Sequence, residues 1–301
     1  MTTNRKTNEL HGITRFYWSS VLLFLLLSFS FTACSRSEGR EVVTEHGYNL
    51  SDPVLIKLPL ELDEISGIVY YPKDTSVFAI NDEFGRLYKI FLNQPNLIHM
   101  WPFSGSGDYE DLALIDSNFY VLRSDGSLIC FRFINRDSMY QAVYPFPFGS
   151  NNEFETLYYD SSRHKLMLIC KDCETDKKEF LSCYTFDPWT REFERGPFQF
   201  DVTSIATASG ETKIKFKPSA ADIHPLTGEL YLVSAVNDIL VVADKDGRTR
   251  QVYPLEGRLY KQPEGITFTP SGTMLISNEA AEVGVANILV FPPLQKGKIE
   301  P

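Results

Sequence analysis

Short runs of apolar residues, bounded by Gly, Pro, Asp and Asn, follow one another through most of the chain and predict β-strands. One pattern returns five times: a polar or acidic residue, a small or polar residue and an apolar residue, followed by a strand and a turn. The five copies begin at Glu64, Tyr109, Glu153, Pro218 and Pro263. Equivalent positions are separated by 44, 45, 66 and 43 residues, counted between Ser66, Glu110, Glu155, Ala221 and Glu264. The long third step predicts an insertion within residues 200–215.

Further strands follow each copy, so that the repeat unit is a four-stranded antiparallel sheet. Second strands are expected to begin at Val77, Asn118, Lys165, Glu229 and Thr273, and third strands at Arg86, Ser127, Phe180, Asp238 and Asn287. Fourth strands follow in the first four copies, from Leu97, Tyr140, Arg191 and Arg248. The connections SDGS, DKDGR, PLTGE and PSGT carry residues that are typical of tight hairpin turns.

The fifth copy ends after three strands, and a spare strand, PVLIKLPL at residues 53–60, precedes the first copy. In a propeller whose last blade combines strands from both ends of the chain, one strand must come from the N-terminal end. The sequence therefore predicts an all-β, five-bladed β-propeller of four-stranded antiparallel blades, closed by the N-terminal strand. A six-bladed NHL-like propeller is the alternative ring. A β-sandwich is disfavoured because sandwiches do not repeat at this period.

The N-terminal segment has the pattern of an export signal. A polar, net positive stretch is followed by the apolar run VLLFLLLSF, and small residues stand directly before Cys34 in FTAC. We therefore expect Cys34 to be lipidated. The expected parts of the chain are a lipoprotein signal peptide at 1–33, a lipidated polar tether at 34–52, the propeller at 53–294 and a tail at 295–301. The alternative is an uncleaved anchor over residues 16–33, which are at the short end for a membrane span.

The net charge and the export signal limit the kinds of partner that the protein is expected to bind. Acidic residues outnumber basic ones 39 to 29, which gives a net charge of −10, so binding to nucleic acid is not expected. A lipid anchor on an exported chain places it on a membrane of the bacterial cell envelope, with the outer membrane favoured over the inner. Export also permits disulfides.

Four cysteines lie beyond the lipidation motif: Cys130, Cys170, Cys173 and Cys183. Cys183 can face either Cys170 or Cys173 across one predicted hairpin. A zinc or redox site at Cys170-x-x-Cys173 would need further ligands or a βαβ context that the sequence does not offer. We therefore expect structural cysteines, either free or paired.

Carboxylates from several repeats are expected to meet at one end of the central channel. In a propeller, the first strand of each blade lines the channel, and the start of the first strand lies at the same face as the end of the second. The residues placed there are Glu64, Glu110, Glu155 and Glu264 at first-strand starts, and Asp82 and Glu279 after second strands. Left alone, these groups would repel one another and raise each other's pKa values.

Three arrangements relieve this repulsion: a bound cation, neutralising basic residues or protonation. The residues alone leave the first two equally open. A Ca²⁺ ion takes six to eight oxygen ligands and suits a ring of carboxylates. Alternatively, Arg123 and Lys171, at the ends of the second and third repeats' second strands, can pair with Glu110 and Glu155 and make the ring purely structural.

Several of these stretches resemble one known family. EISGIVY, YEDLALI, FETLYYD, KPSAADIHPLTGELYLVS and QPEGITFTPSGTMLISNE are similar to the SdiA-regulated (YjiK-like) bacterial propellers, over roughly residues 53–291. The resemblance implies a five-bladed propeller, distantly related to NHL-repeat proteins, with a calcium site. It favours Ca²⁺ over a purely structural ring, and it implies no particular activity.

Motifs of common enzyme classes are missing from the sequence: it has no GxSxG, HExxH, Walker A or GxGxxG pattern. Two functions remain. We favour a non-catalytic, calcium-binding module that presents its loops to a protein or glycan partner in the cell envelope. The alternative is a calcium-dependent hydrolase of a small ester, lactone or phosphate. The fold does not decide between them.

Overall fold

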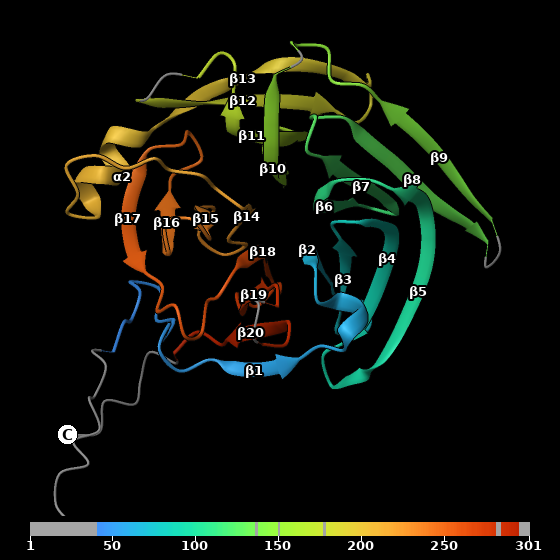
Figure 1. The fold of residues 1–301 in the computed structure, drawn as a ribbon, viewed down its shortest axis with the longest axis horizontal. Helices are drawn as coiled ribbons and strands as arrows, with labels where there is room; N and C mark the ends of the chain where they lie inside the picture. The colour runs from blue at the N-terminus through green and yellow to red at the C-terminus, as the bar shows by residue number, and fades with distance from the viewer. Residues whose placement is uncertain (1–40, 136–137, 150, 177–178, 281–283, 295–301) are drawn as a thin grey trace, which may run out of the picture. The chain divides into compact units, whose positions relative to one another are not determined.

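The computed structural model describes residues 41–135, 138–149, 151–176, 179–280 and 284–294. Within these residues, the strands form five four-stranded antiparallel sheets around a central channel (Figure 1). This confirms the predicted five-bladed propeller over the six-bladed alternative. The predicted signal peptide, Cys34 and the tail at 295–301 lie outside the described residues. Among the residues described, no helix is both long and apolar enough to cross a membrane.

The first three blades follow the repeat in sequence order. Blade 1 contains β2 (Ile65–Tyr71), β3 (Ser76–Asn81), β4 (Phe84–Phe91) and β5 (Gln94–Ser106). Blade 2 contains β6 (Tyr109–Ile115), β7 (Asn118–Arg123), β8 (Leu128–Asn135) and β9 (Ser138–Tyr144). Blade 3 contains β10 (Asn152–Asp160), β11 (Lys165–Cys173), β12 (Phe180–Asp187) and β13 (Glu192–Asp201).

The last two blades contain the insertion and the closure of the ring. Blade 4 contains β14 (Ala220–Ile223), β15 (Leu230–Ser234), β16 (Ile239–Ala243) and β17 (Thr249–Pro254). Blade 5 contains β18 (Pro263–Phe268), β19 (Met274–Asn278), β20 (Asn287–Phe291) and β1 (Val54–Lys57). β1 pairs antiparallel with β20, with Val54 opposite Val290. The N-terminal strand therefore closes the ring as predicted, and the short 3₁₀-helix η1 (Leu60–Leu62) leads from it to blade 1.

The predicted insertion contains the short helix α2 (Val202–Ala208). Asp201 caps it, because its side chain accepts hydrogen bonds from the backbone N–H groups of Thr203 and Ser204. Val202, Ile205 and Ala206 of the helix are buried with residues of blades 3 and 4. The insertion thus covers the gap between these two blades.

The apolar core is divided among the gaps between neighbouring blades. Each of its five clusters within the described residues combines strands of two adjacent blades. In the gap between blades 2 and 3, for example, Leu122 packs in one cluster with Phe154 and Phe186. Successive side chains of a strand point into the gaps on either side of its blade, and both gaps are apolar. This explains why the strands of the repeat are nearly continuous apolar runs in the sequence.

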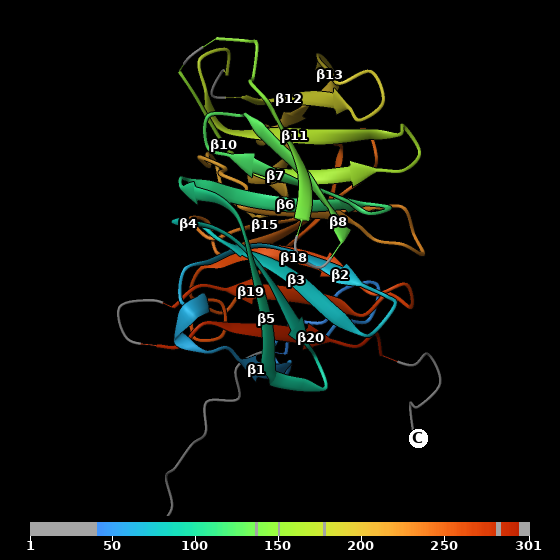
Figure 2. The same cartoon turned by 90° about the vertical axis from the view of Figure 1, so that its right-hand side faces the viewer.

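Two faces of the ring are distinguished below, and Figure 2 shows them edge-on, with the strand ends at either side. We call the face where the first strands begin and the second strands end the acidic face. The other, where the first strands turn into the second strands, is the opposite face. A cavity of about 610 Å³ in the channel is lined by first-strand residues of all five blades and by turns of the opposite face.

Residues 41–52, which we interpreted as part of a tether, instead pack against the propeller, and we call them the strap. Tyr48 and Leu50 are buried in the core between blades 4 and 5. The Tyr48 hydroxyl lies 2.8 Å from His224 Nε2 and donates to the Gly272 carbonyl. The Tyr260 hydroxyl donates to the Leu50 carbonyl at 2.8 Å. The compact unit therefore begins at Glu41, ahead of the predicted boundary at residue 53.

Candidate metal centre

Three of the predicted glutamates are extra residues in their first strands. Glu110 lies between the pairs Tyr109–Arg123 and Asp111–Leu122, so nothing on β7 stands opposite it. The same irregularity places Glu155 in β10 and Glu264 in β18 outside the regular pairing. A β-bulge of this kind turns a side chain away from its normal position in the sheet. The repeat thus carries one bulged glutamate at the acidic face in each of blades 2, 3 and 5.

Blades 1 and 5 bring together the three other predicted carboxylates. Glu64 directly precedes β2, Asp82 follows β3 and Glu279 follows β19, and one carboxylate oxygen of each lies within 4.8 Å of the others. Glu279 Oε2 accepts a hydrogen bond of 2.7 Å from Gln262 Nε2. Asp82 Oδ1 is buried and has no hydrogen-bond partner. We call Glu64, Asp82 and Glu279 the carboxylate cluster.

Backbone hydrogen bonds hold this cluster in place. The Asp82 N–H donates to the Glu64 carbonyl at 3.2 Å, and the Glu279 N–H donates to the Gln262 carbonyl at 3.0 Å. The Asp82 carbonyl accepts from the Tyr109 N–H of blade 2 at 2.9 Å. Backbone hydrogen bonds therefore fix the positions of the residues that carry these three carboxylates at the end of the channel.

Glu155 is separated from the cluster by a basic partner. Lys171 forms an ion pair with Glu155 and lies 2.9 Å from Glu153. Glu155 is therefore neutralised by Lys171, as the structural alternative predicted for blade 3. This leaves it a weaker candidate for a metal ligand than the other five residues.

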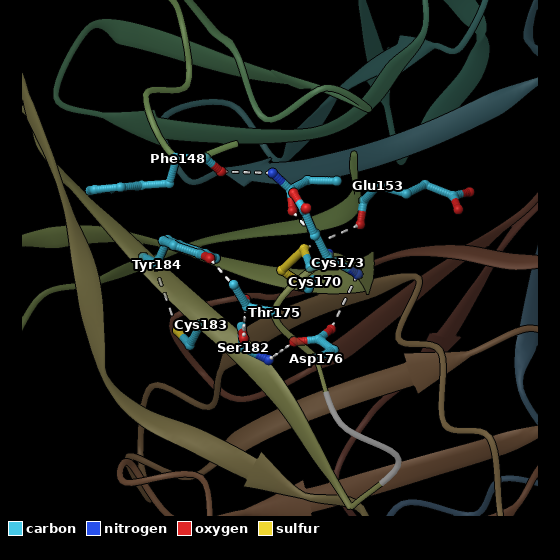
Figure 3. The surroundings of a disulfide bond; sticks show 11 residues. Phe148, Glu153, Cys170, Cys173, Thr175, Asp176, Ser182, Cys183 and Tyr184 are labelled. Carbon is cyan, nitrogen blue, oxygen red and sulfur yellow. Dashed lines mark hydrogen bonds between the residues drawn. A yellow bond between two sulfur atoms is a disulfide. The ribbon is translucent and has the colours of Figure 1, made fainter. Parts of the chain in front are cut away.

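The cysteines next to Lys171 pair in a way that we did not predict. Cys170 forms a disulfide with Cys173, and Cys183 lies near them without a disulfide partner (Figure 3). Cys183 and Cys130 are both free and buried. Neither of the cross-strand pairings with Cys183 that the sequence left open is formed. The register explains this, because Lys171 is itself an extra residue between Cys170 and Asp172. The bulge lets two cysteines of one strand approach each other.

Blade 2 lacks the predicted ion pair. Arg123 lies 3.8 Å from Asp125 and is not paired with Glu110. Asp108, a residue that we did not select from the sequence, instead acts on Glu110 and adds to the rise in its pKa that burial causes. Asp108 directly precedes the YED motif, where the first strand of blade 2 begins. This position in the sequence could have identified it as a further carboxylate of the acidic face.

The pKa values at this face rise in the way that crowded, half-buried carboxyls require. Burial and the neighbouring Glu64 raise the pKa of Glu279 to about 9. Burial raises the pKa of Asp82 to about 6, with a further contribution from Glu64. Burial and Asp108 raise the pKa of Glu110 to about 8. Burial raises the pKa of Glu264 to about 7, although Lys171 and a hydrogen bond with Ser219 oppose this rise.

These residues fit a hard divalent cation. Ca²⁺ is bound by oxygens at 2.3–2.6 Å, so two oxygens on opposite sides of one ion lie up to about 5 Å apart. The three carboxylate oxygens of the cluster lie within that span of one another. The orphaned Asp82 Oδ1 supplies a buried acceptor that lacks a donor. The cluster contains neither histidine nor cysteine, so its donor set favours Ca²⁺ or Mg²⁺ over Zn²⁺.

The second group of candidate ligands within the described residues does not compete. It consists of Cys170, Cys173 and Asp176, and the disulfide removes both thiolates from it. Asp176 accepts from the Ser182 N–H at 2.7 Å and from the Cys173 N–H at 3.3 Å.

The metal-free protein is expected to lose stability as the pH rises from 5 to 9. Folding raises the pKa of Asp82, Glu110, Glu264 and Glu279, so their contribution is complete below their unfolded values near 4 and is lost as the pH passes through the folded values. Thermal melts in the presence of a chelator measure this. Glu279→Gln should flatten the dependence. A chelated protein whose melting temperature is constant or rises over this range would contradict the raised pKa values.

Solved structures with a similar fold belong to proteins of different kinds. Glutaminyl cyclase from Myxococcus xanthus aligns with a TM-score of 0.55 and 15% identity, over 80% of this chain and 95% of that chain. A luciferin-regenerating enzyme aligns with a TM-score of 0.52 and 10% identity, over 81% and 96%. The calcium-binding protein regucalcin from Agrobacterium tumefaciens aligns with a TM-score of 0.50 and 13% identity, over 81% and 94%. At such low identity, these likenesses show the fold alone.

Sequence comparison is more specific. The profile of the SdiA-regulated family matches residues 57–282, which is most of the propeller. No curated protein matches the chain.

Proposed function

The chain belongs to the SdiA-regulated family, and from this premise we propose that it is an exported, lipid-anchored, calcium-binding β-propeller that acts as a non-catalytic binding module of the cell envelope. The carboxylate cluster carries the calcium part of this proposal. Three carboxylates within 4.8 Å of one another, one with a buried oxygen that lacks a partner, are stabilised by a divalent cation more simply than by protons at neutral pH.

The proposed ligands are Glu64, Asp82 and Glu279. Glu264 acts electrostatically on the same region, because, in addition to burial, Asp82 raises its pKa and it raises the pKa of both Glu110 and Glu279. A bound cation would attach blade 1 to blade 5, and these two blades meet where the ring closes. Its role in a binding module is therefore to make the acidic face rigid.

The positions of the histidines support the non-catalytic role. In the described part of the chain, His224 lies at the opposite face and its Nδ1 accepts from the N–H groups of Leu226 and Thr227, at 3.2 Å each. His46 is bound to Glu229. Lys171 is held by two glutamates. None of these bases is left available beside the carboxylate cluster.

One observation favours the hydrolase as a second candidate. The pKa of Glu264 is raised to about 7, in the range that suits a general acid or base at neutral pH. Assays with small esters, lactones and phosphomonoesters, with and without chelator, separate the two functions. Turnover that requires calcium and is lost in Glu264→Gln would show that the protein is a hydrolase and would contradict the non-catalytic binding module.

Calcium is expected to raise the melting temperature of the wild-type protein. A ligand that binds only the folded state at a hundredfold excess over its Kd adds about 2.7 kcal/mol of stability. Glu279→Gln and Asp82→Asn should lose most of this gain, because each removes a charged ligand and keeps the shape of the side chain. Melts in calcium and in chelator, together with metal analysis of the purified protein, measure the effect.

Glu155→Gln is the matched control. Its carboxylate lies at the same face but is paired with Lys171, so the calcium-dependent gain should persist in this variant. If the wild-type protein contains no calcium and has the same melting temperature in calcium and in chelator, the calcium site is contradicted. The carboxylates of the acidic face would then have only a structural role. A gain that is lost only in Glu155→Gln would move the site to blade 3.

A further inference from the structure

The channel cavity has a mostly apolar wall and opens at the opposite face. First strands of all five blades supply apolar side chains to the wall: Ile68, Leu112, Leu157, Ile223 and Ile266. Exposed turn residues of four blades surround the entrance: Pro72, Ser161, Pro225 and Pro270. The volume of about 610 Å³ lies within the range of roughly 300–1,000 Å³ that is usual for small-molecule sites. A small molecule can therefore enter the channel between these turns.

Two carboxylates interrupt the apolar wall. Asp111 in β6 and Asp222 in β14 both line the cavity, and Asp111 is only 3% exposed. The Asp111 carboxylate accepts hydrogen bonds from two backbone N–H groups, at 2.7 Å each. Asp222 accepts from the Ile223 N–H at 2.8 Å and from the Thr267 hydroxyl at 3.1 Å. These bonds fix the orientation of both groups and leave acceptor capacity, because a carboxylate offers about four lone-pair sites.

No basic group of the described residues forms an ion pair with these two carboxylates. The basic groups nearby are otherwise engaged: Arg163 is bound to Asp160 and Asp246. Lys245 lines the entrance but is exposed to solvent. His224 also lines the cavity, but burial lowers its pKa and its Nδ1 accepts from two backbone N–H groups. Its ring is therefore neutral, and the carboxylates lack a counter-charge.

This arrangement favours the uptake of a positive charge. Moving a carboxylate out of water is costly unless the group is paired or protonated. Burial raises the pKa of Asp222 only to about 6, so this group is still largely ionised at neutral pH. Burial also raises the pKa of Asp111, and the charge of Asp222 contributes to that rise. The two carboxylates thus act on one region of the cavity, and a cation bound there would relieve both.

The surroundings favour an organic cation over a metal ion. Among the residues that the structure describes, neither Asp111 nor Asp222 belongs to a group of three side chains that could share one metal ion. An ammonium group donates up to three hydrogen bonds to separate acceptors and needs no closed shell of oxygens. The hydrocarbon part of such a molecule would also bury apolar surface against the wall.

We propose that the channel cavity binds a small organic ammonium ion, which enters from the opposite face and places its charged group against Asp111 and Asp222. This site is separate from the carboxylate cluster and requires neither calcium nor a lipid anchor. A neutral molecule of the same shape would leave the two carboxylates without a counter-charge. The charge of the ligand should therefore determine its affinity.

Two probes of nearly equal size test this proposal: 4-bromobenzylammonium and the neutral 4-bromobenzyl alcohol. Isothermal titration calorimetry measures their binding to the purified protein in the presence of a chelator. We expect the ammonium ion to bind at least tenfold more tightly than the alcohol. Asp222→Asn should weaken binding of the ammonium ion at least fivefold and leave binding of the alcohol unchanged. The matched control is Asp187→Asn, because this carboxylate caps a turn of blade 3 outside the cavity and its loss should change neither affinity.

The bromine atom locates the probe directly, by anomalous scattering from crystals of the wild-type protein soaked in the ammonium ion. We expect its peak in the channel cavity, and this measurement decides the question if Asp222→Asn does not fold. Equal affinities for the two probes, no binding of the ammonium ion, or a bromine peak outside the channel would overturn the proposal. Loss of ammonium binding in Glu279→Gln but not in Asp222→Asn would assign the probe to the carboxylate cluster, and would overturn it as well.

Discussion

Replacement of Val54–Lys57 by Gly-Ser-Gly-Ser is expected to abolish the cooperative unfolding of the propeller. The change removes β1 and leaves β20 as an unpaired sheet edge. Four residues of antiparallel pairing, at about 1 kcal/mol for each hydrogen bond, and the partly buried Ile56 together stabilise the native state by roughly 5 kcal/mol. This is comparable with the whole free energy of unfolding of an ordinary domain.

The same replacement at residues 140–143 in β9 is the matched control. That strand is also the fourth strand of a blade, but it lies in blade 2, where the chain continues on both sides. Circular dichroism melts and light scattering report the result. We expect the β9 variant to melt at a lower temperature and still cooperatively, and the β1 variant to aggregate or to unfold gradually. Equal behaviour of both variants would show that β1 has no special part in closing the ring.

Gly67→Ala is expected to destabilise the protein by about 3 kcal/mol or more, because the first strands of blades 1 and 2 approach too closely for a side chain. A Cβ at this position would lie 2.6 Å from Asp111 Cα and 2.6 Å from the Leu112 nitrogen. These are backbone atoms of β6, so the strand itself would have to move. Asp111 resists this, because its carboxylate accepts from the N–H groups of Leu112 and of Leu157 in blade 3, at 2.7 Å each.

Gly105→Ala provides the comparison for this variant. Gly105 also lies in a strand of blade 1, and a Cβ there would meet nothing within 4 Å. Its free energy of unfolding should change by no more than about 1 kcal/mol. Chemical denaturation of both variants measures the difference. Similar values for the two would mean that the strands around the channel adapt to the extra methyl group.

The strands were predictable because their chemistry is local and repeated. Apolar runs, turn residues and one spare strand at residues 53–60 determine the number of blades and the closure. The strap was missed for a physical reason: its sequence is mostly polar and has no period, and Tyr48 and Leu50 become buried only because blades 4 and 5 leave a gap for them. A contact of this kind depends on tertiary structure and leaves no pattern in the strap itself.

The sequence predicted the face of the propeller on which the candidate site lies, but it did not predict the contacts between the side chains of the site. Alignment of the repeats placed the six carboxylates at one end of the channel. It could not show that Glu110, Glu155 and Glu264 are bulge residues, because a bulge is a matter of register between two strands. For the same reason the sequence did not distinguish Lys171, which pairs with Glu155, from Arg123, which turns to Asp125.

The strap and β1 also determine when the protein can finish folding during synthesis. β1 emerges first, but its partner β20 is separated from it by more than two hundred residues, and the strap's partners His224 and Tyr260 lie in the last third of the chain. β1 and the buried strap residues therefore lack their distant native partners until nearly the whole chain has been synthesised. Closure of such a distant pair is slow, and it leaves an apolar strand exposed in the meantime. The N-terminal strand is therefore open to aggregation until the C-terminal blade is available to pair with it.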